Sequence, residues 1–173
     1  AFSCCNSLKN ITIKGDKTAI SKFALFSCSS LTNITVNESN EYNSHVDGVL
    51  YNKDKSKLLC YPAGKKETSF EIPNGVTSIG HYAFEECRRL ESIILNGVTS
   101  IDEHAFSDCC SLTSITISES ITNIGNYAFV ACDSLDTVYY SGTEEQKEKI
   151  KIGKNNECLL NADWIYISFG EEN

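Results

Sequence analysis

The sequence predicts a β-rich α/β solenoid, a coil in which short parallel strands stack side by side. One observation is a pattern, A-F-x-x-C-x-x-L-x-x-I-x-I, that fits residues 83–95, 105–117 and 128–140 with few changes. Another is its I-x-I ending, which alternates with period two, so that both apolar side chains point to one face of a strand. We therefore expect about six short parallel strands, joined by turns that return the chain to the next strand.

The length of the repeat is nearly constant, with one longer interval. The second apolar position of the strand recurs at 13, 36, 72, 95, 117 and 140, at intervals of 23, 36, 23, 22 and 23 residues. A period of about 20 to 29 residues with this apolar spacing is typical of leucine-rich repeats. The sequence thus predicts a right-handed leucine-rich-repeat coil, whose stacked turns share a core that no single turn could bury.

The chain begins with two repeats, at residues 1–36, and three regular ones follow at 76–140. Within the regular repeats, residues 76–80, 98–102 and 121–125 each predict a short extended segment. A helical turn is expected after each segment, carrying the Ala-Phe pair. We expect the apolar residue of this pair to fill the back of the core at Phe2, Leu25, Phe84, Phe106 and Phe129.

The interval from 36 to 72 is 13 residues longer than one repeat. Within it, the apolar runs 46–51 and 57–61 flank a polar, charged segment at 52–56. Two such runs around a polar tip predict a β-hairpin. We therefore interpret residues 37–75 as one expanded repeat that carries a hairpin insert, within a single leucine-rich-repeat domain at 1–173.

The repeat stops after Tyr140, and residues 141–173 are expected to cover the end of the coil. Thr143 and Gln146 have the spacing of a capping box. They predict a short helix to about Ile150, which leads to a last strand at 164–167. No matching segment precedes the first repeat, so we expect the chain to be a fragment of a longer protein.

The charge of the chain argues against several classes of partner. The formal net charge is −8 and the pI is near 4.9. Nucleic acid and anionic membrane surfaces both require a basic face. No apolar run approaches the roughly 20 residues of a spanning helix. We therefore expect a protein partner, no nucleic acid and no membrane insertion in this segment.

The repeated pattern, with Ile72-Pro73-Asn74-Gly75-Val76-Thr77-Ser78-Ile79-Gly80 between copies, resembles the BspA-like leucine-rich repeats. The insert, with Asp47-Gly48-Val49-Leu50-Tyr51 and Tyr61-Pro62-Ala63-Gly64-Lys65, and the segment 140–146 also resemble parts of that family. The chain departs from it at Leu25, which takes the Phe position, and at Ser118, where Pro is frequent. The resemblance implies a surface or secreted protein of bacteria or protozoan parasites.

The cysteines are the first residues to test for chemistry. Five of the nine hold one position of the repeat, at Cys5, Cys28, Cys87, Cys109 and Cys132. Free cysteine behaves as a small buried hydrophobe, so we interpret this column as core filling. Cys110 is expected to face outward. No C-x-x-C pair occurs, and no metal or cofactor is predicted.

No catalytic motif is present in the sequence. A cysteine nucleophile needs a histidine to activate it. His81 and His104 are expected on the outer turns, and His104 occupies the position held by Tyr82 and Tyr127. A partly exposed filling role is the expectation for both, and we predict that the protein is not an enzyme.

The candidate partner-binding surface is the outward side of the strands. The middle position of each strand points outward, at Thr12, Thr35, Glu71, Ile94, Thr116 and Tyr139. Six strands at about 4.8 Å spacing offer on the order of 300 Å² of exposed face. A specific interface needs about 800 Å² per partner. Binding would therefore also need the hairpin or further repeats.

Two functions are consistent with these features. The first is a non-catalytic protein-binding scaffold at the cell surface or secreted, which adheres to host or matrix proteins as a monomer. The alternative is an intracellular leucine-rich-repeat regulator that docks on a partner enzyme in the cytoplasm. Free column thiols would suit that reducing compartment.

Overall fold

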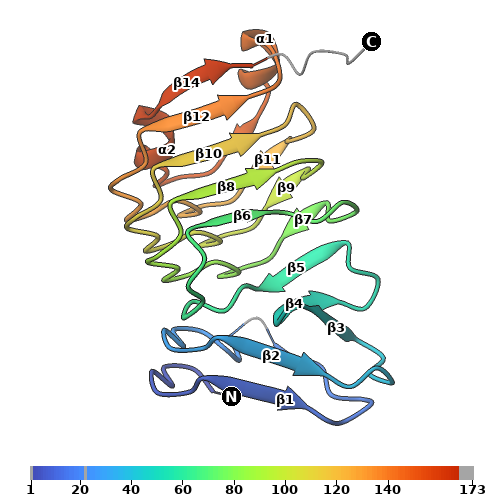
Figure 1. Ribbon diagram of the computed structural model, residues 1–173. Helices are drawn as coiled ribbons and strands as arrows, with labels where there is room; N and C mark the ends of the chain where they lie inside the picture. The colour runs from blue at the N-terminus through green and yellow to red at the C-terminus, as the bar shows by residue number, and fades with distance from the viewer. Residues whose placement is uncertain (1, 22, 168–173) are drawn as a thin grey trace.

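The computed structural model describes residues 2–21 and 23–167, and these form a solenoid of stacked coils (Figure 1). Each regular coil contributes one strand to a front row and a shorter strand to a back sheet. The front strands are β1 (Asn10–Ile13), β2 (Asn33–Val36), β6 (Ser69–Glu71), β8 (Ser92–Leu95), β10 (Ser114–Ile117), β12 (Thr137–Tyr140) and β14 (Asp163–Tyr166). The predicted solenoid of short parallel strands is confirmed.

A second, seven-stranded sheet forms the back, in the order β13-β11-β9-β7-β5-β4-β3. The predicted extended segments of the regular repeats are present in it as two-residue strands. They are β7 (Ser78–Ile79), β9 (Ser100–Ile101) and β11 (Asn123–Ile124). The other members are β3 (Asn43–Val46), β4 (Val49–Asn52), β5 (Lys57–Cys60) and β13 (Lys151–Ile152).

Equivalent positions of neighbouring repeats lie directly beside each other. Among the front strands, Ile115 of β10 is paired with Ile93 of β8 on one side and with Val138 of β12 on the other. All three side chains are at most 1% exposed. The alternation of the I-x-I motif thus places its apolar residues in a continuous core, as the sequence predicts.

Two ladders run through this core. The rings of Phe84, Phe106 and Phe129 stack with centroids 4.9 and 5.0 Å apart. The buried thiol of Cys109 donates to the main-chain oxygen of Phe84 at 3.0 Å, and Cys132 donates to that of Phe106 at 3.0 Å. The cysteine column therefore fills space and also satisfies carbonyl groups of the preceding coil.

The turns that carry the Ala-Phe pairs are not helical, so this expectation is wrong. His104 and Asp108 flank one pair with φ angles of 57° and 60°, in the left-handed region. The amide of Phe106, between them, donates to the oxygen of Ala128 in the next coil at 2.8 Å. Because these amides bond between coils, they are not available for the i to i−4 bonds of a helix.

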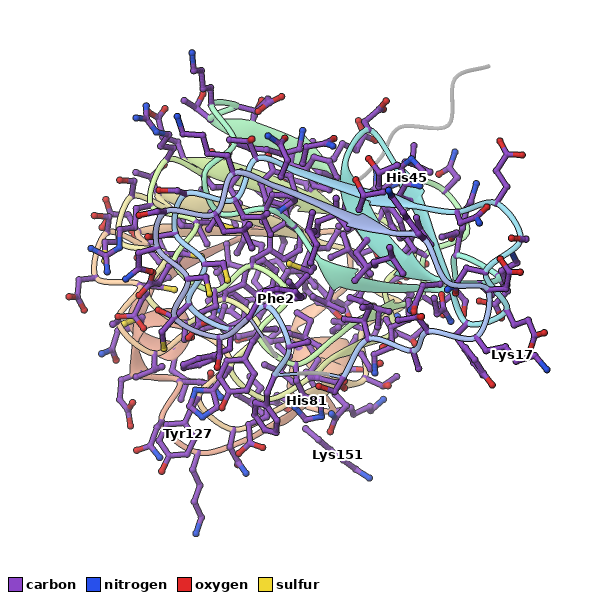
Figure 2. All side chains as sticks on the ribbon, turned by 90° about the horizontal axis from the view of Figure 1, so that it is seen from below. Phe2, Lys17, His45, His81, Tyr127 and Lys151 are labelled. Carbon is purple, nitrogen blue, oxygen red and sulfur yellow. The ribbon has the colours of Figure 1, made fainter. Side chains whose placement is uncertain are left out.

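The prediction that Phe2 fills the back of the core is wrong, because its side chain is 50% exposed. Its amide donates to the oxygen of Ala24 at 2.8 Å, as the later phenylalanines do in their coils. Figure 2, seen from below, shows Phe2 facing the viewer at the end of the stack. The ring holds the repeat position, but no described coil precedes it and covers it.

The predicted hairpin is present, because β4 and β5 pair antiparallel. The insert nevertheless differs from the prediction in two ways. A further strand, β3, pairs antiparallel with β4, and β5 pairs parallel with β7. The insert is therefore a three-stranded part of the back sheet and not a projecting hairpin.

The expected single row of front strands is interrupted between β2 and β6. β1 and β2 form a two-stranded sheet, and β6, β8, β10, β12 and β14 form a separate five-stranded sheet. The free edge of β2 bonds to the insert, where Ile34 donates to the oxygen of Gly48 and Val36 to Nδ1 of His45, at 3.0 and 3.1 Å. The insert thus occupies the position of a partner strand.

The core is divided at the same place. Ile13, Leu25, Leu31 and Ile34 belong to an N-terminal hydrophobic cluster, and the regular repeats form a second one. The ring of Tyr82 bridges them, with its centroid 5.6 Å from that of Phe23 and 5.0 Å from that of Phe26. The first two coils are therefore joined to the rest mainly through side chains of the turns and the insert.

The predicted capping box is present at helix α1 (Glu144–Lys147), where Gln146 and Thr143 bond reciprocally. The helix is shorter than expected. A second helix, α2 (Glu157–Asn161), was not predicted. The last strand, β14, pairs with β12 as part of the front sheet and begins one residue earlier than expected. Residues 168–173 of the predicted cap lie outside the described residues.

Candidate protein-binding face

The predicted surface residues of four coils lie in one column of the five-stranded sheet. Glu71 is paired with Ile94, Ile94 with Thr116, and Thr116 with Tyr139. The column continues to Ile165 of β14, which is paired with Tyr139. We call these five residues the front column. The strand register places them side by side because every repeat contributes the same position.

Three members of the front column are exposed apolar side chains. Ile94 is 36% exposed, Tyr139 37% and Ile165 45%. Single exposed apolar residues are ordinary, but an aligned group on one sheet face is typical of an interaction surface. Glu71 is also exposed, whereas Thr116 is half-buried between its neighbours. The front column is therefore apolar toward the C-terminal end of the sheet and acidic at β6.

Thr12 and Thr35 do not belong to the front column. They are paired with each other in the separate sheet of β1 and β2. The six residues predicted as one surface thus lie on two sheets. The insert causes this division, because it takes the edge of β2 that β6 would otherwise occupy.

Ile165 was missed by the sequence reasoning. The signal was the expected strand at 164–167, because Ile165 takes the outward position of Tyr139 once the two strands pair in register. A column of polar residues runs beside the front column on the same face, two positions earlier in each strand. Its members are Ser69, Ser92, Ser114, Thr137 and Asp163.

A second candidate site is a cleft of about 250 Å³ between the N-terminal cluster and the regular repeats. Its walls include the apolar side chains of Ile20, Leu25, Phe26, Leu50 and Leu59. Three residues that are able to carry chemistry, Lys57, Cys60 and His81, also line the cleft.

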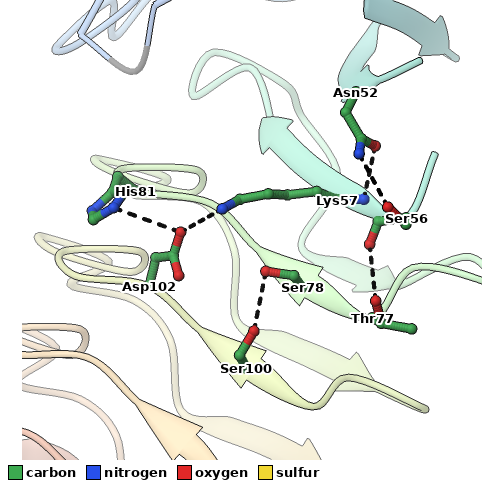
Figure 3. A network of polar contacts seen from close by, with 8 residues as sticks. All are labelled: Asn52, Ser56, Lys57, Thr77, Ser78, His81, Ser100 and Asp102. Carbon is green, nitrogen blue, oxygen red and sulfur yellow. Dashed lines mark hydrogen bonds and ion pairs between the residues drawn. The ribbon is translucent and has the colours of Figure 1, made fainter. Parts of the chain in front are cut away.

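Asp102 organises the polar side of this cleft (Figure 3). Its Oδ2 lies 2.6 Å from Nζ of Lys57 and 3.7 Å from Nε2 of His81. The lysine side chain is about one-third exposed, and the histidine and aspartate side chains are less so. Because the ammonium group of Lys57 is already paired with Asp102, the cleft has little positive charge left to attract an anion.

Cys60 and His81 line the same cleft, which the sequence did not predict. Within residues 2–21 and 23–167 they form no hydrogen bond with each other. Burial raises the pKa of the Cys60 thiol to about 12, and the neighbouring Cys28 and Glu85 add to the effect. The thiol is therefore held in its protonated form, which is a poor nucleophile.

His104 lies in an outer row of rings. It stacks between Tyr82 and Tyr127, with both centroid distances 4.9 Å and interplanar angles of 6° and 5°. In the part of the chain that the structure describes, no group of three or more His, Cys, Asp or Glu side chains could hold a metal ion. No described helix is long and apolar enough to cross a membrane.

These features define a leucine-rich-repeat solenoid with an exposed front face. The family model of the BspA type leucine-rich repeat region matches residues 1–57 and 60–158 in six copies. The chain belongs to this family. Leucine-rich repeats of this kind support protein binding as a general role. No curated protein matches the chain in a sequence search.

Two solved structures share the fold. A leucine-rich repeat protein from Eubacterium ventriosum is 32% identical, with a TM-score of 0.73 over 79% of this chain and 37% of that one. The pneumococcal vaccine antigen PcpA is 21% identical, with a TM-score of 0.64 over 94% of this chain and 46% of that one. The chain thus spans less than half the length of either.

Proposed function

We propose that the protein is a non-catalytic scaffold that binds a partner protein through the front column. The observation that carries this proposal is the alignment of Ile94, Tyr139 and Ile165 on one exposed sheet face. Tyrosine is among the residues that contribute most to binding energy in protein interfaces, and apolar neighbours exclude water around it. The adjoining column supplies hydroxyl groups at Ser69, Ser92, Ser114 and Thr137 and one carboxylate, at Asp163 of β14.

We further propose that this binding is adhesion to a host or matrix protein, at the cell surface or after secretion. Membership in the BspA type family supports this, as does the likeness to a protein known as a vaccine antigen. The net charge of −8 favours a protein partner over nucleic acid. The monomeric state is part of the same proposal.

The test is binding of the purified chain to immobilised matrix proteins and to intact host cells. The double variant Ile94→Ala/Tyr139→Ala should weaken binding at least about tenfold, because it removes two anchors of the face. The control is Leu160→Ala, which removes a more exposed apolar side chain from α2, away from the front column. Equal binding by the double variant and the wild type would refute the front column as the interface.

The second candidate function is an intracellular regulator that docks on a partner enzyme. The nine free cysteines favour it, because a reducing compartment keeps thiols free. Cells of the organism that produces the protein are fractionated, and an antibody detects the chain in each fraction. Its location distinguishes the two functions. Recovery only in the cytosolic fraction would exclude adhesion.

A further inference from the structure

β6 is the edge strand of the five-stranded front sheet, and only one of its two edges is paired. It pairs with β8 on one side. In Figure 1, β4 and β5 of the insert lie between β6 and β2. Because β2 bonds to the insert, no described strand pairs with the opposite edge of β6. We call this unpaired side the β6 edge.

The coil that carries β6 is otherwise regular. Tyr61 precedes Phe70 by nine residues, as Phe84 precedes Ile93. The ring of Tyr61 stacks on that of Phe84 at 5.1 Å, and its amide donates to the oxygen of Ala83 at 2.7 Å. Tyr61 thus takes the phenylalanine position, and this coil is stacked on the next one in the usual way. Only its side toward the first two coils is incomplete.

The bonds to β8 show which main-chain groups of β6 are unpaired. The amide of Ile72 donates to the oxygen of Ile94 at 2.9 Å. In a parallel ladder, alternate residues direct their main-chain groups to opposite edges. Phe70 therefore bonds to β8 as Ile72 does. Ser69 and Glu71 each direct one N–H and one C=O to the β6 edge, where no described residue bonds to them.

The β6 edge is also accessible. Ser69 and Glu71 are exposed. Phe70 is partly exposed, whereas Ile93 and Ile115, at its position in later strands, are at most 1% exposed. A pocket of about 190 Å³ between β6 and β4 leaves space beside the strand. A further strand would therefore cover both the unpaired main chain and this flank of the core.

The chemistry of the β6 edge selects an extended peptide. Donors and acceptors that alternate along a strand edge are matched by the main chain of another strand. Pro73, the next residue that faces this edge, has no N–H, so the pairing is limited to about residues 69–71. The carboxylate of Glu71 has the side chain of Ile94 on one side and no strand neighbour on the other. A basic residue at the adjacent position of an added strand would pair with it.

We propose that an extended segment of the partner protein pairs in parallel with β6 along the β6 edge and places a basic residue beside Glu71. Its alternate residues, whose main chains bond to β6, should be apolar. In β2 and β8 the residues that bond toward the next coil, such as Ile34 and Ile93, have buried side chains. The inference rests on the proposed protein-binding function and adds a main-chain contact next to the front column.

The probe is the peptide acetyl-Thr-Val-Lys-Val-Thr-amide, added to the whole chain of 173 residues, with amide hydrogen exchange followed by NMR. In the free protein, the amides of Ser69 and Glu71 should exchange fast and those of Phe70 and Ile72 slowly. We expect a Kd of about 1 mM, since short peptides bind weakly. At about ten times this concentration, exchange at Ser69 and Glu71 should slow about tenfold, because only the unbound fraction exchanges.

Two N-methylated peptides give a matched comparison. N-methylation of both valines removes the N–H groups that would face β6, so it should abolish the protection. N-methylation of the lysine alters the opposite edge of the peptide and should leave the protection unchanged. In the protein, Ser69→Pro removes one unpaired N–H at the start of a strand, where proline is tolerated. It should weaken peptide binding about three- to tenfold, the range of one hydrogen bond, whereas Ser69→Ala keeps the N–H and should bind as the wild type does.

No protection by the unmodified peptide, or equal protection by the peptide methylated at its valines, would overturn the proposal. Protection that appears without peptide and rises with protein concentration would assign the β6 edge to a second copy of the chain, and would also overturn it. Ile94→Ala/Tyr139→Ala should leave peptide binding intact. Failure of the β6 edge and failure of the front column are therefore separate results.

Discussion

The side-chain oxygen of Asn156 accepts a hydrogen bond from the main-chain amide of Phe129 at 3.0 Å. In the preceding coil, the equivalent amide of Phe106 donates to the main-chain oxygen of Ala128 in the next coil. Asn156 therefore provides, with a side chain, the acceptor that a further coil would provide with its backbone. Its Nδ2 donates to the oxygens of Gly125 and Gly153, both at 2.9 Å.

Asn156→Ala should destabilise the protein by about 2–4 kcal/mol, because it leaves buried donor and acceptor groups of three residues unpaired. Urea unfolding monitored by circular dichroism measures the change. Asn161→Ala, at an exposed position of α2, is the control and should stay within about 0.5 kcal/mol of the wild type. A small effect of both variants would mean that water replaces the Asn156 side chain at no cost.

Cys109→Ala should cost about 1–3 kcal/mol of stability. The substitution opens a small cavity in the buried column and leaves the oxygen of Phe84 without its thiol donor. The neighbouring Cys110 is exposed, so Cys110→Ala should have almost no effect. Chemical denaturation of the two variants under reducing conditions makes the comparison. Equal stability of the two would contradict the role assigned to the column.

Stability should depend on pH through Glu85. Burial, with Glu86 and Asp108 nearby, raises the pKa of Glu85 to about 7, although the amide of Ser27 donates to its carboxylate at 2.9 Å. The folded state then binds a proton that the unfolded state releases near the ordinary glutamate pKa. The stabilising contribution is therefore present at low pH and is lost as pH rises toward 7 and above.

Glu85→Gln tests this sign. Relative to the wild type, the variant should gain stability between pH 5 and pH 8, because glutamine does not ionise. Urea titrations of both proteins at the two pH values give the difference, which cancels the contributions of other carboxylates. Glu91→Gln, at an exposed side chain, should show no such trend. A parallel pH dependence of Glu85→Gln and the wild type would rule out Glu85 as the titrating group.

Gly142→Ala should destabilise the end of the coil by about 1–3 kcal/mol. A Cβ at this position would lie 2.6 Å from Cζ and Oη of Tyr140, whose ring is fully buried. In a Tyr140→Leu background the same substitution should cost less, since the shorter side chain leaves the space free. Thermal unfolding of the wild type, the two single variants and the double variant gives the coupling between positions 142 and 140. Additive effects would show that the clash is relieved elsewhere.

Much of the scaffold could be predicted because each coil repeats one pattern with few changes. The inward positions, such as Ile115 and Cys109, follow from the period of the strand and the length of the repeat. Four of the six predicted surface residues, from Glu71 to Tyr139, lie in one column for the same reason. Thr12 and Thr35 were assigned to the wrong sheet, because repeat spacing does not state where the stack is interrupted.

The sequence by itself determined the solenoid, its inward and outward positions and the capping box of α1. These depend on local periodicity, which acts over a few residues. Only the tertiary structure decided how the insert joins the back sheet, where the core divides, that Tyr61 takes a phenylalanine position and that Asn156 replaces a backbone acceptor. These features depend on which hydrogen-bonding edges remain unpaired after the coils stack, and this is settled between residues far apart in the chain.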